Sequence, residues 1–250
     1  MISSKKAKKM MQKPDIAILD GDILIYKAAF WADTEGIEDL ESRLKLDIEN
    51  WTPDGVSKVY LARSCSRYDN FRRQILPSYK ANRDTKPEPE SLGIAKEILE
   101  DIGPTRNVSR IEADDLMGIG ASSGKAIAVT IDKDLRGVPG WHWNPEKEAE
   151  PIFISEEEAD KFFACQLITG DVSDNITGLF RKGKHYFEKN ILPFDPEDWW
   201  WEIWWAYEEA GNDMDFFLSQ ARCLRILRDG EYDKDTNEIK LWDLPDRYAL

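Results

Sequence analysis

Acidic residues gather at four separate points of this chain, and one short stretch contains three of them. The segment IEADD brings Glu112, Asp114 and Asp115 into four consecutive positions, just before a run of small and apolar residues. One or two acids favour the start of a helix, where free N–H groups and the helix dipole attract negative charge. A third acid adds repulsion, which a divalent metal ion relieves because it prefers oxygen ligands. The pattern leaves two interpretations open, a helix cap and a metal site.

The other acids of the pattern lie far away in the sequence. Asp20 stands in ILDGD, Asp132 and Asp134 stand in TIDKDL, and Asp171 and Asp174 stand in GDVSDNITG. Taken singly, each is explained as a cap or turn residue. Taken together, they form the acid-rich shell that a pair of divalent ions requires for in-line displacement at phosphorus. The joint pattern therefore favours a two-metal site that hydrolyses phosphoesters.

A parallel sheet would bring these distant acids together. Short aliphatic and β-branched runs predict buried strands that deliver polar residues at their carboxyl ends, and helical patterns lie between them. This alternation indicates an α/β fold with a mostly parallel sheet, helices on both faces and ligands at the carboxyl ends of the strands. A helical second half is expected to follow. The expected strands are 16–20, 56–62 and 126–132, and the expected helices are 37–50, 90–102, 112–121, 155–168, 195–210 and 213–228.

Length and composition exclude several classes of protein. The chain has 250 residues, enough for one large domain, and it shows neither a transmembrane span nor a secretory signal. We therefore expect a cytoplasmic protein that does not bind a membrane. Cys65, Cys165 and Cys223 lie far apart, which argues against disulfides and against a zinc site.

Charge gives two opposing indications about nucleic acid. The net charge of -14 argues against phosphate binding, which depends on Lys and Arg. Basic residues nevertheless cluster in FRRQILPSYKANR at 71–83 and in FRKGKHYFEK at 180–189. These strips either follow a phosphate backbone or are solvated charge on surface helices. Residues 1–13 are also basic and are expected to form a flexible tail.

Five blocks of the sequence resemble the 5′-nucleases, a family of flap endonucleases, 5′-nuclease domains of bacterial DNA polymerases and phage 5′→3′ exonucleases. The blocks are ILDGD, FRRQILPSYKANR, IEADDLMG, TIDKDL and GDVSDNITG, and residues 220–242 resemble the end of the exonucleases of short-tailed phages. The resemblance implies a PIN-like catalytic core over 14–168. A helix-three-turn-helix-like segment and a helical region over 169–250 would complete the same domain. The implied activity is hydrolysis of DNA or RNA from a 5′ end, with possible flap cleavage, in phage replication, primer removal or breakdown of host DNA.

The resemblance also assigns metal ligands and partners. It implies two Mg²⁺ or Mn²⁺ ions, the first held by Asp20, Glu112 and Asp114, the second by Asp132, Asp134 and Asp171. Asp115 and Asp174 match additional acids of the bacterial and phage members. The implied partners are duplex DNA with 5′ ends or flaps, RNA–DNA hybrids and phage replication proteins.

The basic residues receive roles from the same resemblance. Lys80 and Arg83 fall where cationic side chains reach the scissile phosphate, and Tyr79 is expected to support a terminal base. A hairpin near residues 170–184 is expected to grip duplex phosphates, with a bound K⁺ assisting. The nucleic-acid-binding set is Arg72, Arg73, Gly178, Arg181, Lys182, Gly183 and Lys184.

Two positions depart from the family pattern. The family places a further metal-ligand Asp shortly after the second strand, where this chain has Ser64 or Cys65. Asp69 is the nearest acid, either a replacement or the cap of the next helix. In the hairpin, Arg181 stands where the family usually has the middle one of three glycines, although its charge suits phosphate.

Two other functions stay open at this point. Asp20 as nucleophile, Asp22 as acid/base, and Asp171 with Asp174 on magnesium would fit a haloacid-dehalogenase-like phosphatase, which leaves YKANR and EADD unexplained. The third reading is a catalytically impaired relative that only binds nucleic acid. In WWWEIWWAYEE, helical spacing favours core packing of Trp201, Trp204 and Trp205 over stacking on bases, while some of the five tryptophans stay exposed and could meet a partner.

Overall fold

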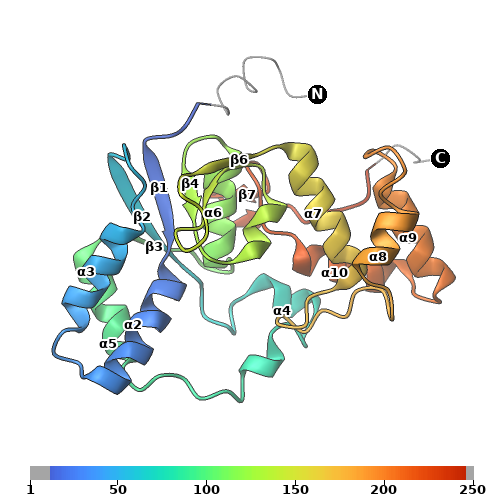
Figure 1. Cartoon of the computed structure of the whole chain (residues 1–250). Helices are drawn as coiled ribbons and strands as arrows, with labels where there is room; N and C mark the ends of the chain where they lie inside the picture. Colours follow the sequence, from blue (N-terminus) through green and yellow to red (C-terminus); the bar gives the residue numbers. More distant parts are fainter. Residues whose placement is uncertain (1–11, 246–250) are drawn as a thin grey trace.

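One six-stranded sheet forms the centre of the protein, whose computed structural model describes residues 12–245 (Figure 1). The strand order is β3–β2–β1–β4–β5–β6, and neighbours are parallel except β5 and β6. The predicted mostly parallel sheet is therefore confirmed. Nearly all of the predicted 1–13 tail lies outside the described residues. The strands are β1 (Ile16–Asp20), β2 (Lys58–Arg63), β3 (Thr105–Asn107), β4 (Ile127–Val129), β5 (Gly140–Trp143) and β6 (Ile152–Ile154).

Helices cover both faces of the sheet, as the alternating pattern predicts. Helices α2 (Gly21–Glu35), α3 (Leu40–Asn50) and α5 (Leu92–Ile102) share a core with Leu19 of β1 and lie together on one side (Figure 1). On the other face, α6 (Ala113–Ser122) packs with Ile18 and with Ala128 of β4. Successive strand residues point to opposite faces, so both helical layers are anchored by the same short strands. No helix within residues 12–245 is long and apolar enough to cross a membrane.

The second half is mostly helical and has its own core. It contains α7 (Glu156–Thr169), α8 (Lys184–Asn190), α9 (Trp199–Glu209) and α10 (Met214–Leu224), followed by a small hairpin of β7 (Tyr232–Asp233) and β8 (Glu238–Ile239). Aromatic rings dominate this core, with Tyr207 against Phe217 and Phe163 against Trp200. The loop 170–183 between α7 and α8 occupies the place of the predicted helix-three-turn-helix-like motif.

The buried face of the tryptophan-rich helix α9 differs from the predicted one. Trp199, Trp200 and Trp204 are buried, whereas Trp205, expected in the core, is 44% exposed. The buried stripe also contains Ile203 and Tyr207, whose hydroxyl donates to the Leu167 carbonyl. With five tryptophans in seven positions, the aromatic residues alone do not show which face is apolar, and the isoleucine and tyrosine decide it.

Several short elements are absent from the sequence prediction. Strands β3 and β6 have three residues each, and β5 reads GWHW, which lacks an aliphatic run. Helix α2 follows β1 without a loop, because Asp20 both ends the strand and caps the helix. The expected strand 126–132 stops at Val129, since Asp132 caps a 3₁₀ turn over Lys133–Gly137. Helix α4 (Phe71–Ile75) is also short.

A buried ion pair ties α4 to α6 and to the chain after α10. The Arg72 guanidinium donates to both carboxylate oxygens of Asp115 at 2.7 Å, and to the carbonyls of Cys223 and Arg225 at 3.0 and 2.7 Å. Asp115 also accepts from the Leu227 amide, so three separate segments meet at one charge pair. Arg72 is 2% exposed. This burial contradicts its predicted contact with nucleic acid, because the guanidinium pairs with Asp115 inside the protein.

Arg72→Ala should lower the free energy of unfolding by about 3–5 kcal/mol, because it leaves the Asp115 carboxylate buried without its cation. Arg73→Ala is the matched control. Arg73 pairs with Asp84 at the surface, where ion pairs contribute little to stability. Urea denaturation of both variants in EDTA measures the difference, and equal losses would contradict the structural role given to Arg72.

Candidate metal and nucleic-acid site

The acids predicted from the sequence meet around one cavity at the carboxyl edge of the sheet. The cavity has a volume of about 1070 Å³. Strand ends, the start of α6 and the loop after α7 all contribute to it. Its acidic lining residues are Asp20, Asp22, Asp84, Glu88, Glu112, Asp114, Asp132, Asp134, Asp171 and Asp174. Asp115 is the one predicted metal ligand that does not line it.

Asp20 is held rigidly at the junction of β1 and α2. One carboxylate oxygen accepts from the Ile23 amide at 3.0 Å, and the other accepts from the Thr130 hydroxyl at 2.8 Å. Burial, and then the neighbouring charge of Asp22, raise the pKa of Asp20 to about 7. Thr130 also accepts from the Asp132 amide, so it fixes two predicted ligands at once. Sequence reasoning missed Thr130, although it directly follows β4.

The EADD segment contains both a helix cap and an acid that lines the cavity. Glu112 is the N-cap of α6, and Asp115 completes a capping box by accepting from the Glu112 amide at 2.9 Å. Asp115 is fully buried and committed to this cap and to Arg72, which contradicts its assignment as a metal ligand. Asp114 instead faces the cavity. Burial, and then the charge of Asp20, raise the pKa of Asp114 well above its usual range.

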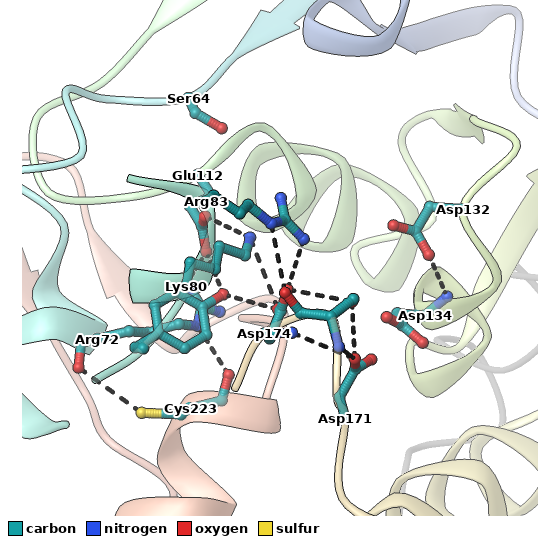
Figure 2. Close-up of polar contacts among 12 residues, drawn as sticks. Ser64, Arg72, Lys80, Arg83, Glu112, Asp132, Asp134, Asp171, Asp174 and Cys223 are labelled. Carbon is teal, nitrogen blue, oxygen red and sulfur yellow. Dashed lines mark hydrogen bonds and ion pairs between the residues drawn. The ribbon is translucent and has the colours of Figure 1, made fainter. Parts of the chain in front are cut away.

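The second predicted group of ligands comes from the η2 turn and the loop after α7. The Asp134 carboxylate accepts from the Gln166 amide at 2.9 Å, and the Asp132 carboxylate accepts from the Asp134 amide at 2.9 Å. Burial, and then Asp132, raise the pKa of Asp134 to about 7. Asp171 is buried, yet hydrogen bonds from Ser173 outweigh the burial and lower its pKa. Figure 2 shows Asp132 and Asp134 on the side of Asp171 away from the basic residues.

This donor set suits hard divalent cations. All of the acids offer oxygen, the ligand that Mg²⁺ and Mn²⁺ prefer. Burial first, and repulsion from a neighbouring carboxylate second, raise the pKa values of Asp20 and Asp134, and a bound cation offsets both costs. Within residues 12–245, no three His, Cys, Asp or Glu side chains are close enough to hold an ion as they stand. The residues fit a divalent ion in chemistry, and their side chains must draw together to bind it.

The YKANR segment lies against the acids and the loop after α7. The Lys80 ammonium is 2.7 Å from Glu112 Oε1 and 3.6 Å from Asp174 Oδ2, and Arg83 donates to Asp174 at 2.7 Å (Figure 2). Burial lowers the pKa of Lys80, but the two carboxylates outweigh it, so the pKa stays above its usual value. Burial likewise raises the pKa of Glu112, while Lys80 and Arg72 together lower it to about 2. Lys80 and Arg83 thus lie at the acids, and their contact with a scissile phosphate stays a prediction.

Tyr79 does not have the predicted role of supporting a terminal base. It is 2% exposed, and its hydroxyl lies 2.8 Å from Glu112 Oε2 and 3.1 Å from Asp174 Oδ2. The ring is covered by Arg72 and Lys80. Tyr79 therefore positions two carboxylates. Arg73 is engaged with Asp84 and with the Lys80 carbonyl, so it fixes the YKANR segment from outside.

Asp69 does not replace the acid that the family pattern places after the second strand. Its carboxylate accepts from the Ser109 hydroxyl and the Arg110 amide, at 2.7 and 2.9 Å, and it does not line the cavity. It is not the cap of α4 either, because Asn70 has that position. Ser64 and Cys65 do line the cavity, and the Ser64 amide donates to Asp22 at 3.0 Å. From the sequence alone, Asp22 is a weak candidate for a metal ligand, since the family pattern does not include it.

The loop 170–183 depends on two glycines that face each other. Gly170 and Gly178 both have positive φ, and a Cβ atom on Gly178 would stand 2.3 Å from the Gly170 amide nitrogen. Gly178 is buried there and its N–H points toward the Gln220 side chain at 3.4 Å, which contradicts a direct phosphate contact. The rest of the predicted hairpin set is exposed at the surface: Arg181, Lys182, Gly183 and Lys184.

Comparisons with known proteins agree with the resemblance. No family model matches the sequence. The exonuclease of Escherichia phage T7 and the exodeoxyribonuclease of Enterobacteria phage T3 are each 26% identical over 211 residues, which is 69% of this chain and 70% of each relative. DNA polymerase I of Mycobacterium tuberculosis is 26% identical over 213 residues, which is 73% of this chain and 23% of the polymerase.

Solved structures share the fold. The phage T5 5′-exonuclease with bound zinc ions has a TM-score of 0.57 at 17% identity, over 84% of this chain and 88% of that one. The phage T5 flap endonuclease in a complex with DNA and metal ions has a TM-score of 0.55 at 18% identity, over 83% and 90%. The catalytic core of Rad2 in complex with DNA substrate has a TM-score of 0.50 at 16% identity, over 95% and 86%. In sequence and in fold, this chain is therefore similar to the 5′-nucleases, phage exonucleases among them.

Mg²⁺ should stabilise the protein more as the pH rises. Asp20 and Asp134 have pKa values of about 7 in the fold against 3.8 when unperturbed, so the metal-free fold retains protons that the unfolded chain releases. Stability without metal therefore falls as the pH rises through about 7, while metal binding, which needs ionised carboxylates, strengthens over the same range. Thermal unfolding with Mg²⁺ or EDTA between about pH 6.5 and 8 measures both effects.

Asp134→Asn is the control for this prediction. In EDTA, the midpoint temperature of thermal unfolding should fall less with rising pH in this variant than in the wild type, since one of the two titrating groups is gone. His142 acts in the opposite direction at the lower end of this range: burial lowers its pKa to about 4, so near pH 6.5 only the unfolded chain binds its proton. The comparison of Asp134→Asn with the wild type cancels this contribution, since both proteins contain His142. A stabilising effect of Mg²⁺ that shrank with rising pH would contradict the assignment of these carboxylates.

Proposed function

We propose that this protein is a metal-dependent 5′→3′ exonuclease that hydrolyses phosphodiester bonds of duplex DNA. The observation that carries the proposal is one cavity that Lys80 lines together with carboxylates from separate segments, two of which, Glu112 and Asp174, pair with Lys80. Divalent ions bound by these carboxylates would activate water and stabilise the leaving oxygen. The relatives named exonuclease support the reaction, and the matches give no support to a phosphatase.

The residues divide into ligands and cationic side chains. Asp20, Glu112 and Asp114 would hold one ion, and Asp132, Asp134 and Asp171 the other. Asp174 accepts from Arg83 and Tyr79, so its main role would be to keep the YKANR segment against the acids. Lys80, packed between Glu112 and Asp174, is the cation best placed to neutralise charge that develops on a scissile phosphate.

A second basic surface supports the binding of duplex DNA. Arg181, Lys182 and Lys184 are exposed on the loop between α7 and α8, with the Arg181 guanidinium over the Phe180 ring and Lys182 over Tyr186. A net charge of -14 does not prevent this, because much of the acid lies in the cavity where cations neutralise it. Such contacts to phosphate fix position without reading sequence.

The finer parts of the proposal concern ions, substrates and place. We infer that Mg²⁺ or Mn²⁺ is the working ion, and that a K⁺ ion assists the loop 170–183. Flaps and the RNA strand of RNA–DNA hybrids are further substrates, since backbone and ends carry the recognition. Because the named relatives include phage proteins, we infer work in the cytoplasm of an infected bacterium, together with phage replication proteins, in primer removal or breakdown of host DNA.

A linear duplex labelled at one 5′ end should lose its label first when Mg²⁺ is added, and EDTA should stop the loss, because the carboxylates act only through the ion. Gel analysis of a 5′-labelled and a 3′-labelled duplex over time measures the direction. Loss that begins at the 3′ label, or that continues in EDTA, would exclude the proposed reaction.

The control for this assay is Asp132→Asn combined with Asp134→Asn, which should abolish turnover and keep duplex binding. If Asp22→Asn were the more damaging change, and a phosphate mimic such as beryllium fluoride were trapped on Asp20, the phosphatase reading would hold instead. A protein that binds duplex without any turnover would be the impaired relative.

The two basic clusters should separate rate from affinity. Lys80→Ala should lower the single-turnover rate by on the order of 10² with little change in duplex affinity, the scale of one lost electrostatic contact. Lys182→Ala with Lys184→Ala should weaken binding to every sequence and reduce the salt dependence by about one unit of slope per contact. Affinity is measured in Ca²⁺ at several salt concentrations, and rate in Mg²⁺ at saturating enzyme.

A matched surface control for these lysines is Lys45→Ala, because Lys45 is exposed on α3 and pairs only with Glu41 in the same helix. It should change neither rate nor affinity. If Lys80→Ala altered only affinity, or the loop lysines altered only the rate, the division of roles between the clusters would be wrong.

A further inference from the structure

The strand β2 ends in the cavity without an acid of its own. Its neighbour β1 delivers Asp20 and β4 is followed by Asp132, whereas the residue after β2 is Ser64. The carboxylate nearest to that strand end comes from another element. Asp22, in the first turn of α2, accepts the Ser64 amide at 3.0 Å, although 42 positions separate the two residues.

We propose that Asp22 is a ligand of the divalent ion bound on the Asp20 side of the cavity, and that it supplies the carboxylate that β2 lacks. This inference rests on the proposed function, since it concerns the same cavity. It adds a ligand that the family pattern does not contain, and it gives the departure at Ser64 a structural explanation.

The position of Asp22 relative to the other acids supports the proposal. Asp22 lines the same cavity as Asp20 and Glu112. Ser64 links Asp22 to the start of α6, because the Ser64 amide donates to Asp22 and the Ser64 hydroxyl accepts from the amide of Ala113 at 3.0 Å, next to Glu112. Asp22 is therefore held by the same residue that contacts the start of α6.

Some acids of this region pair with an internal cation. Glu112 and Asp174 pair with Lys80, and Asp115 pairs with Arg72. Within residues 12–245, Asp22 forms no ion pair, like Asp20, and the adjacent Arg63 pairs with Glu100. A half-buried carboxylate without an ion pair repels the acids around it, and a bound divalent ion would remove that cost.

The plainer reading of Asp22 is an acid that favours the start of a helix. Asp20 already has that role, because it caps α2 through the Ile23 amide. The Asp22 side chain instead turns to Ser64 at the edge of the cavity. The other candidates for the missing ligand fit less well: Asp69 lies outside the cavity, and the Cys65 thiol is a poor partner for hard ions.

Metal binding by the protein without DNA tests the proposal directly. Mn²⁺ binding, measured by titration calorimetry and by the loss of the free-ion electron paramagnetic resonance signal, should show one ion weakened by about 10-fold or more in Asp22→Asn. The other ion should keep its affinity. Asp69→Asn is the matched control, a nearby acid of the same type outside the cavity, and it should bind Mn²⁺ like the wild type.

A variant that moves the carboxylate from position 22 to position 64 gives a sharper test. Asp22→Asn combined with Ser64→Asp should recover most of the lost Mn²⁺ affinity, since the new acid stands at the strand end that Asp22 reaches. Thermal unfolding in EDTA shows whether each variant is folded. In Asp22→Asn, saturating Mn²⁺ should also restore the single-turnover rate, which would not occur if Asp22 transferred a proton.

Unchanged Mn²⁺ affinity in folded Asp22→Asn would overturn the proposal, and so would loss of both ions to the same extent with no recovery in the double variant. These outcomes are independent of the nuclease assignment. A wild-type protein that bound two ions through Asp22 but released no label from 5′-ended duplex would remove the proposed function and leave the ligand in place.

Discussion

Repulsion among carboxylates at one edge of the sheet is the constraint on which the rest of the structure depends. The parallel strands bring acids from distant segments into one cavity, and without cations their charges oppose folding. Two internal cations offset part of this repulsion. Arg72 neutralises Asp115 inside the core, and Lys80 lies between Glu112 and Asp174. Within residues 12–245, Asp20 forms no ion pair, and Asp134 pairs with the exposed Lys133 at 3.1 Å. Burial, and then neighbouring carboxylates, raise the pKa of both acids to about 7.

The same constraint explains why structural and functional residues alternate within one motif. In EADD, Glu112 and Asp115 close a capping box, Asp115 joins Arg72, and Asp114 faces the cavity. In YKANR, Tyr79 is buried and orients carboxylates, while Lys80 carries the charge. One short segment thus provides both the support and the group supported.

The sequence predicts the sheet, most helices and the meeting of the acids, because strand ends of a parallel sheet share one edge. It does not predict which acids stay available. Asp115 and Arg72 look like surface charges in their motifs, and only the path of residues 223–228 back to α6 makes them a buried pair. The role of Asp22 at the cavity is also hard to predict, because its hydrogen-bond partner Ser64 lies 42 positions away. Short strands such as β3 and β6 leave too few residues for a periodic signal.

The paired glycines of the loop after α7 have a consequence for how this protein tolerates sequence change. At Gly170 a Cβ atom would stand 2.4 Å from the Ile176 carbonyl, and at Gly178 it would stand 2.3 Å from the Gly170 amide nitrogen. A larger residue at either site is therefore blocked by backbone, which no rotamer change can relieve. Gly183 has open space around it. Libraries that diversify this loop can vary 183 without a backbone clash, whereas 170 and 178 fix the spacing that carries Asp171 and Asp174.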